Sequence, residues 1–135
     1  MKRVFVYGTL MKGYGNHRVF LEGKARQCGR GIIKGELFHL PEGYPGLLKG
    51  EGPVRGEVYE IRDENVLKSL DGLEGYEEGG SGNLYERARE TVTMEGEETL
   101  ECWVYYYRDG DYARSRGVFV ENGDWKAFME RRGEQ

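Results

Sequence analysis

Apolar residues in the first half of the chain occur in short runs and alternating stretches, the pattern that predicts β-strands. Three such stretches are residues 3–7, 29–38 and 54–61. Gly56 interrupts the alternation of the third stretch, which indicates a bulge or the close approach of another backbone. A glycine-rich loop at residues 8–15 follows the first strand. Asn16 then predicts the N-cap of a short helix that ends near Glu22.

The second half of the chain combines helical patterns with two further alternating stretches. Asp63 predicts the N-cap of a helix that runs to about Leu70, and Gly72 stands just beyond its expected end. Residues 71–75 would then form a loop directly after this helix. Asp124 predicts the cap of a short C-terminal helix. The two alternating stretches, which predict a hairpin, are residues 85–94 and 100–107.

Together these elements predict the class of the fold. We count about five or six strands and two or three short helices. Because many short strands with few helices favour a closed sheet, we expect a small mixed β-barrel with flanking helices, in the α+β class. The pattern contains no internal repeat and no segment with the composition of a linker. We therefore expect residues 1–135 to form a single domain.

Length and charge narrow the possible partners and location. A chain of 135 residues is long enough to bury a core as one domain. Its formal net charge of −4 argues against binding to nucleic acid, which requires clustered Lys and Arg. The longest apolar runs have the length of strands, and the N-terminal run lacks the pattern of a signal peptide. We expect a cytoplasmic protein that does not span a membrane.

The two cysteines, Cys28 and Cys102, do not form a metal-binding pattern. They lack Cys-x-x-Cys spacing, and the chain has only two histidines that could join them as ligands. A disulfide is uncommon in a reducing compartment. We therefore predict two buried thiols and no metal site.

Two glycine-containing segments carry the candidate chemistry. Residues 4–10 read Val-Phe-Val-Tyr-Gly-Thr-Leu, so Gly8 ends a buried strand and leaves backbone N–H groups without sheet partners. Such groups can bind an anion. Residues 70–76 read Leu-Asp-Gly-Leu-Glu-Gly-Tyr and place a carboxylate on a tight turn flanked by glycine. An anion-binding turn together with one carboxylate indicates an enzyme that acts on a small zwitterion.

These segments belong to a series of six short blocks. The blocks are Val4 to Leu10, Gly15-Asn16-His17, Tyr44-Pro45, Gly56 to Tyr59, Leu70 to Gly75, and Tyr85-Glu86-Arg87. In this order they resemble the γ-glutamylcyclotransferase-like superfamily, most closely its γ-glutamylamine cyclotransferase and AIG2-like branch. The resemblance spans nearly the whole chain.

The resemblance implies a compact β-barrel and an enzyme that cyclises a γ-glutamyl group without a metal or cofactor. The products would be 5-oxoproline and a free amine or amino acid, and Glu74 would be the general acid/base. The γ-glutamyl group would be bound by backbone N–H groups within Tyr7, Gly8, Thr9 and Leu10. Tyr44 and Tyr85 fall in matching blocks, so we expect both in the substrate pocket with Tyr7. Packing is the alternative role for Tyr7 and Tyr44.

One carboxylate can perform both proton transfers if its pKa lies nearer neutrality than that of a free glutamate. The neighbours of Glu74 predict such a rise, because nearby like charges and desolvation both raise the pKa of a carboxyl group. The acidic neighbours are Asp71, Glu77 and Glu78, and the desolvating ones are Leu73 and Tyr76.

Two other functions stay open at this point. The chain could be a non-catalytic small-molecule-binding or interaction module, or it could use the same acid/base on a different acyl substrate, as in natural-product biosynthesis. Glu74 favours catalysis, since a pure binder need not keep an acid/base. The segment of residues 76–84 is longer and more acidic than the corresponding segment of the γ-glutamylamine enzymes. The sequence therefore does not define which amine departs. The oligomeric state is not predicted. We expect His17 to be exposed and His39 to lie at the surface or an edge.

Overall fold

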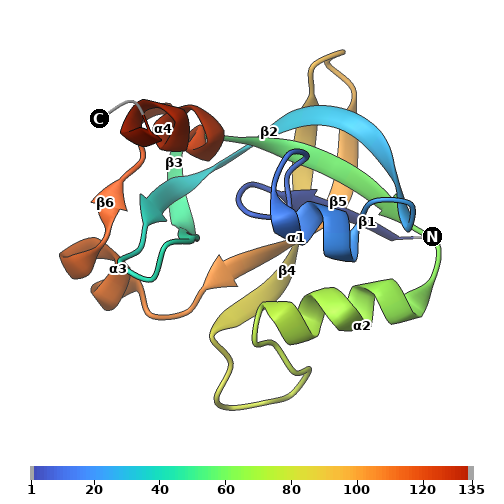
Figure 1. The fold of residues 1–135 in the computed structure, drawn as a ribbon, viewed down its shortest axis with the longest axis horizontal. Helices are drawn as coiled ribbons and strands as arrows, with labels where there is room; N and C mark the ends of the chain where they lie inside the picture. Colours follow the sequence, from blue (N-terminus) through green and yellow to red (C-terminus); the bar gives the residue numbers. More distant parts are fainter. Residues whose placement is uncertain (1, 134–135) are drawn as a thin grey trace.

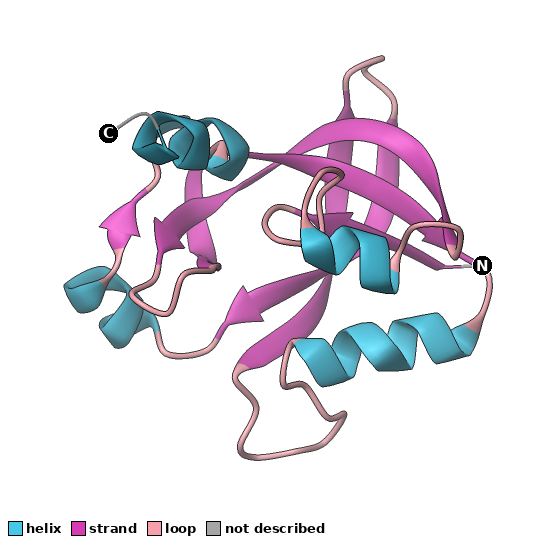
Figure 2. Cartoon of the chain, in the orientation of Figure 1, coloured by secondary structure: helices cyan, strands magenta, loops and turns pink. Residues whose placement is uncertain are grey.

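The strands close into a mixed five-stranded barrel with a sixth, short strand at its edge (Figures 1 and 2). The strands are β1 (Lys2–Val6), β2 (Ala25–His39), β3 (Pro45–Ile61), β4 (Tyr85–Met94), β5 (Thr99–Tyr107) and β6 (Val118–Phe119). The computed structural model describes residues 2–133. The order around the barrel is β3-β1-β5-β4-β2, and β2 pairs with β3 to complete the ring. β1 and β5 are parallel, whereas the other pairs are antiparallel. The predicted barrel is confirmed.

The long strands β2 and β3 pair over nearly their whole length. A Cβ atom at Gly56 would collide with the carbonyl oxygen of Val6, so the close approach predicted at this glycine is confirmed. The sequence pattern predicts only residues 54–61 of β3. Its first half, residues 45–53, is rich in glycine and lacks alternation, and its pairing with β2 defines it instead.

Within residues 2–133, four helices and one 3-10 turn lie outside the barrel. They are α1 (Gly15–Phe20), α2 (Glu64–Leu73), α3 (Gly110–Arg116), η1 (Glu121–Gly123) and α4 (Trp125–Gly133). The cap predicted at Asp63 is confirmed, since its side chain accepts the N–H of Asn65 at 2.9 Å. Asp124 likewise accepts the N–H of Ala127 at 3.0 Å. The pattern predicts no element at residues 110–123, because elements this short show no periodicity.

Two helix boundaries differ from the prediction, and both differences affect the site. Asn16 lies inside α1, and its side chain bonds to Thr9 instead of capping the helix. α2 ends at Leu73, beyond the expected end at Leu70. Gly72 is therefore helical, and Gly75, with φ of 63°, is the glycine that terminates the helix.

The core fills the barrel and extends beneath α4. Trp125 of α4 is 2% exposed, and its indole N–H donates to Nδ1 of His39 at 3.2 Å. His39 is thus buried, and it pairs with Pro45 of β3 on one side and with Val118 of β6 on the other, so the prediction of a position at the surface or an edge is wrong. Burial lowers the pKa of His39, as does the charge of Arg132. Cys102 is a buried thiol as predicted, whereas Cys28 is half-buried.

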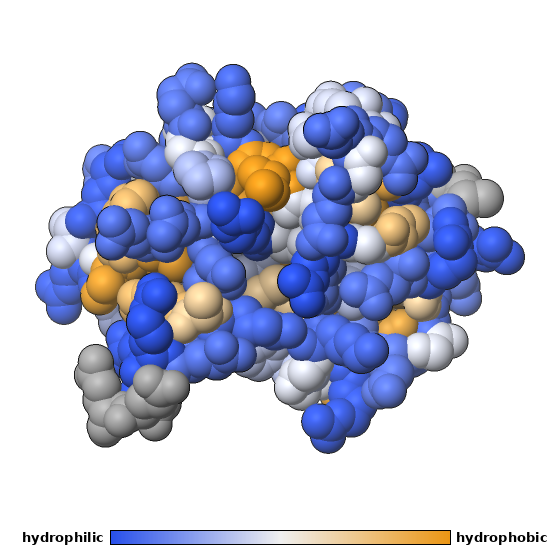
Figure 3. Space-filling model, turned by 90° about the horizontal axis from the view of Figure 1, so that it is seen from above, coloured by the Kyte–Doolittle hydropathy of each residue, from blue (hydrophilic) through white to orange (hydrophobic). Residues whose placement is uncertain are grey.

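The face of the molecule shown in Figure 3 is mainly hydrophilic, with a few hydrophobic spots. Large apolar side chains that are exposed include Val19, Ile32, Leu73, Leu84, Val118 and Phe119. Within residues 2–133, no helix is long and apolar enough to cross a membrane.

Candidate active site

A cavity of about 330 Å³ lies between the end of β1, the turn before β3 and the end of α2. It is lined by residues from segments far apart in the sequence, including residues 5–10, 42–45, 73–74 and 84–85. Every site residue predicted from the sequence lies in this lining: Tyr7, Gly8, Thr9, Leu10, Tyr44, Glu74 and Tyr85. The structure therefore brings these residues together, and their individual roles stay predictions.

Glu74 is positioned by the way α2 ends. The N–H of Tyr76 donates to the carbonyl of Asp71 at 2.8 Å, and the N–H of Gly75 donates to that of Gly72 at 3.3 Å. This is the Schellman arrangement, which requires a left-handed residue just past the helix. Gly75 adopts that conformation. Glu74 is consequently the C-cap residue of α2 and not a member of a separate loop.

Glu74 is a half-buried residue of the cavity wall. Among residues 2–133 it has no hydrogen-bond partner, so burial is not compensated by a donor. Burial raises its pKa to about 7. The predicted rise is confirmed.

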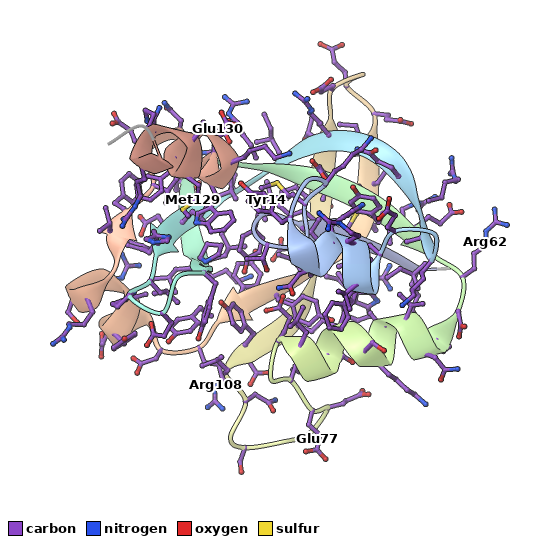
Figure 4. All side chains as sticks on the ribbon, viewed as in Figure 1. Tyr14, Arg62, Glu77, Arg108, Met129 and Glu130 are labelled. Carbon is purple, nitrogen blue, oxygen red and sulfur yellow. The ribbon has the colours of Figure 1, made fainter. Side chains whose placement is uncertain are left out.

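The predicted cause of this rise is wrong in one respect, because acidic neighbours do not contribute to it. Asp71 is paired with Arg87 at 2.9 Å. Glu77 is exposed and points away from the barrel on the loop after α2 (Figure 4). Glu78 is exposed as well. Desolvation alone accounts for the shift.

Four tyrosines line the cavity, and the hydroxyl groups of three of them donate to other groups of the protein. Tyr7 donates to the carbonyl of Tyr105 at 2.6 Å, and Tyr85 donates to that of Pro45 at 2.6 Å. Tyr105 donates to the Asp71 carboxylate at 2.6 Å. Burial raises the pKa of all three phenols well above the ordinary value. The rings therefore stay neutral and add apolar surface around Glu74.

The turn after β1 faces the same cavity. Its backbone bond runs from the N–H of Met11 to the carbonyl of Gly8 at 3.0 Å. Among the turn and loop hydrogen bonds of residues 2–133, none has an N–H of residues 8–10 as its donor. The Thr9 hydroxyl accepts from the Asn16 amide at 2.8 Å and keeps its own proton free to donate. These groups can hold an anion.

Side chains behind the turn hold it in place. His17 Nδ1 lies 3.0 Å from the carbonyl oxygen of Leu10, and its ring packs 5.3 Å from that of Tyr59. His17 is half-buried, so the prediction of an exposed histidine is wrong. The N–H of Lys12 donates to the buried carboxylate of Glu57 at 2.9 Å.

Sequence reasoning missed several contributors to the site. Tyr105 lines the cavity, whereas its alternation with neighbouring aromatics favours packing over a place in the pocket. The sequence suggests that Arg87 pairs with an acidic residue without identifying which one, and in the structure this residue is Asp71. The spacing of Asp71 and Glu74 holds the missing signal, because residues three apart lie on one face of a helix.

Comparison with solved structures defines the class of this barrel. The mouse AIG2-like protein superposes with a TM-score of 0.73 at 31% sequence identity, covering 90% of this chain and 87% of the mouse chain. A protein from Pyrococcus horikoshii superposes with a TM-score of 0.72 at 24% identity, covering 100% and 98% of the two chains, and this likeness concerns the fold alone. The fold is that of the AIG2-like barrels.

Sequence comparison identifies the family. The chain belongs to the family described as gamma-glutamyl cyclotransferase, AIG2-like, which residues 4–127 match. The gamma-L-glutamyl-butirosin B gamma-glutamyl cyclotransferase of Niallia circulans is 37% identical over 129 residues, covering 95% of this chain and 78% of the relative. The gamma-glutamylaminecyclotransferase of Bos taurus is 39% identical over 116 residues, covering 76% of this chain and 63% of the relative.

Proposed function

We propose that this protein is a γ-glutamyl cyclotransferase that releases 5-oxoproline and a free amine, with Glu74 as its acid/base. One observation carries the proposal. Glu74 presents a carboxyl group of pKa about 7, with no hydrogen-bond partner among residues 2–133, to a cavity that also contains the turn at residues 8–10. A group with this pKa can accept and return a proton near neutral pH.

The reaction is intramolecular. The α-amine of the γ-glutamyl group attacks its own δ-carbonyl carbon, forming a C–N bond and a tetrahedral oxyanion. Glu74 removes a proton from the α-ammonium group before the attack. It returns that proton to the leaving nitrogen as the original amide C–N bond breaks and the oxyanion becomes a carbonyl again. The ring nitrogen still carries two protons after the attack. It gives one of them to the Glu74 carboxylate, which passes it to the freed amine, so that 5-oxoproline and an ammonium product leave. The cavity contributes by holding the glutamyl chain folded. The chain therefore loses its orientational entropy on binding, and this loss does not add to the barrier of the chemical step.

The turn at residues 8–10 supplies the complementary donors. Its N–H groups and the Thr9 hydroxyl can bind the substrate α-carboxylate or the oxyanion that forms at the δ-carbon. Because Gly8 packs directly on Pro45, the turn has a fixed position relative to the cavity wall. A donor that is already in place needs no reorganisation when the charge develops.

The names of the relatives support a γ-glutamyl group as the part of the substrate that is cyclised. The butirosin and bovine enzymes both carry γ-glutamyl and cyclotransferase in their names, and they differ in the amine. A purely binding role is less consistent with Glu74, because a desolvated carboxyl group without a partner destabilises the fold at neutral pH. Such a group is typical of a catalytic position.

The experiment is an assay for 5-oxoproline with γ-glutamyl amino acids and γ-glutamyl amines as substrates. We expect Glu74→Gln to lower kcat by about 10²–10⁴-fold. The matched control is Glu78→Gln, the same substitution at an exposed position, which should keep the activity of the parent. Substantial turnover by Glu74→Gln would remove Glu74 from the mechanism. Absence of 5-oxoproline with every substrate would overturn the proposed function.

A further inference from the structure

The C-terminal helix α4 holds the backbone that follows the turn at residues 8–10. Lys126 of α4 donates from Nζ to the carbonyl oxygen of Lys12 at 2.7 Å. The N–H of Lys12 donates to Oε1 of Glu57 at 2.9 Å. Hydrogen bonds to charged groups are stronger than those between neutral groups. Both backbone polar groups of Lys12 are therefore bound by charged side chains.

Glu57 and Lys126 also form an ion pair with each other. Lys126 Nζ lies 3.8 Å from Oε2 of Glu57, whose Oε1 accepts the hydroxyl of Tyr59 at 2.8 Å as well. Glu57 is 7% exposed, and within residues 2–133 Lys126 is its only ion-pair partner. Removal of the ammonium group would leave a buried carboxylate without a counterion, which is strongly unfavourable. The support that Glu57 gives to Lys12 therefore depends on α4.

Aromatic packing fixes α4 against the same segment. The ring of Tyr14, the N-cap residue of α1, lies 5.3 Å from that of Trp125, and Figure 4 places Tyr14 between the two helices. Lys126 Nζ lies 5.8 Å from the centroid of the Tyr14 ring. Trp125 is anchored by its bond to His39. Helix α4 thus contacts the segment at Lys12 and again at Tyr14.

Neither Glu57 nor Lys126 lines the cavity that contains Glu74. Both line a different cavity, of about 580 Å³, between the middle of β2 and β3, the end of β4 and α4. Of the residues that the structure describes, none lines both cavities. An effect of the ion pair on the reaction would therefore pass through protein contacts, and the direct route leads through Lys12 to the turn.

We propose that Lys126 is a positioning residue for the cyclotransferase reaction and that α4 belongs to the architecture of the active site. By binding the Lys12 carbonyl and neutralising Glu57, Lys126 fixes the place of the turn beside the cavity. A displacement of about 1 Å in such a group can lower the rate by about 10²-fold. The inference rests on the proposed function, because it concerns the donors of that reaction.

The test compares three substitutions on α4. Lys126→Met keeps an aliphatic side chain and removes the ammonium group, whereas Lys126→Arg keeps a charged donor. Arg131→Met removes a charge from an exposed position of the same helix and is the matched control. We expect Lys126→Met to lower kcat/KM for 5-oxoproline release by about 10- to 100-fold. Lys126→Arg should recover most of this loss, and Arg131→Met should keep the parental value.

The pH profile separates positioning of the turn from a general loss of structure. Glu74 is held by the end of α2, so its surroundings should not change in Lys126→Met. We therefore expect the acidic limb to stay at a pKa of about 7 while the rate falls. If the barrel loosened instead, water would reach Glu74 and the limb would move towards 4.5.

Hydrogen exchange tests the same contacts without turnover. The N–H of Lys12 is bound by Glu57, and the N–H of Met11 donates to the carbonyl of Gly8 at 3.0 Å. Both amides should exchange about tenfold faster in Lys126→Met, because the opening of this segment becomes easier. The amides that pair β4 with β5 should exchange at the parental rate.

Parental kcat/KM in Lys126→Met, or unchanged exchange at Lys12 and Met11, would overturn the inference and leave the cyclotransferase proposal standing. A loss of rate with an acidic limb near 4.5 would overturn it too, because the effect would then be structural. If the parent releases no 5-oxoproline from any substrate, the proposed function fails, and the inference that rests on it fails as well.

Discussion

Asp71 and Arg87 join the last turn of α2 to β4, with Arg87 Nη1 lying 3.0 and 2.9 Å from the two carboxylate oxygens. The guanidinium group also lies over the ring of Trp103, 4.6 Å from its centroid. Tyr105 donates its hydroxyl to the same carboxylate. Since Asp71 precedes Glu74 by three residues, these contacts fix the end of the helix that presents Glu74 to the cavity.

Asp71→Asn should therefore destabilise the fold and disturb the site. Arg87 is 10% exposed in this pair, so the substitution leaves a mostly buried charge without its partner. We expect the free energy of unfolding, measured in urea, to fall by about 3 kcal/mol. We also expect a lower kcat for 5-oxoproline release, because Glu74 is no longer held in place.

A surface pair on the same helix provides the control. Glu64 of α2 pairs with Lys2 at 3.1 Å, and its side chain is 65% exposed. Glu64→Gln should change the free energy of unfolding by less than about 1 kcal/mol. Equal losses in the two variants would show that the Asp71–Arg87 pair has no special role.

The pKa of Glu74 predicts the pH dependence of the rate. The carboxylate form must accept the proton of the substrate α-ammonium group, and this form predominates above a pKa of about 7. We expect kcat/KM to fall about tenfold for each pH unit below that value. Initial rates measured from about pH 5 to pH 8, on both sides of this pKa, give the acidic limb of the pH–rate profile. An acidic limb centred near the ordinary glutamate pKa of 4.5 would contradict the role of burial.

The same shift predicts an effect on stability with a defined sign. The pKa of Glu74 is about 7 in the folded chain and near 4.5 in the unfolded chain, so the folded state holds the proton more tightly. Its stabilising contribution is complete below pH 4.5 and is lost as the pH rises through 7. Glu74→Gln does not titrate. The free energy of unfolding of Glu74→Gln should therefore rise relative to that of the parent by about 1–3 kcal/mol between low pH and pH 8. Urea unfolding at each pH measures this difference.

Glu78→Gln is the control for this measurement as well. Its side chain is exposed, and its stability difference from the parent should stay nearly constant across the same pH range. If the difference for Glu74→Gln is equally constant, Glu74 is not desolvated in the folded protein.

Much of the site was predictable because its chemistry lies in short local segments. Residues 4–10 and 70–76 each contain the groups that face the cavity, so their residue types reveal both the strand end and the carboxylate. The helix end was misjudged for a local reason. Gly72 and Gly75 are both possible terminators, and the choice between them depends on the bond from the Tyr76 N–H to the Asp71 carbonyl.

The sequence could not predict contacts between segments that lie far apart along the chain. Burial of Glu74 depends on Tyr7, which follows β1, on Tyr85, which begins β4, and on Tyr105 of β5. His39 shows the same limit, because its burial follows from the packing of Trp125, which is 86 residues away. A charge pattern read along the chain likewise overstated the effect of acidic neighbours on Glu74, since it does not show that Arg87 neutralises Asp71.

The close packing of Gly8 against Pro45 gives the last prediction. A Cβ atom at residue 8 would lie 2.5 Å from Cγ and 2.9 Å from Cδ of Pro45, so Gly8→Ala must displace the turn or the proline. We expect a loss of about 1–3 kcal/mol in the free energy of unfolding. Because the turn holds the candidate anion donors, kcat/KM should fall more steeply than stability alone explains. Gly15→Ala is the matched control, since no atom lies within 4 Å of the added Cβ and Gly15 begins α1. That variant should retain activity and match or exceed the parental stability. Parental kinetics in Gly8→Ala would mean that the position of this turn does not limit the reaction.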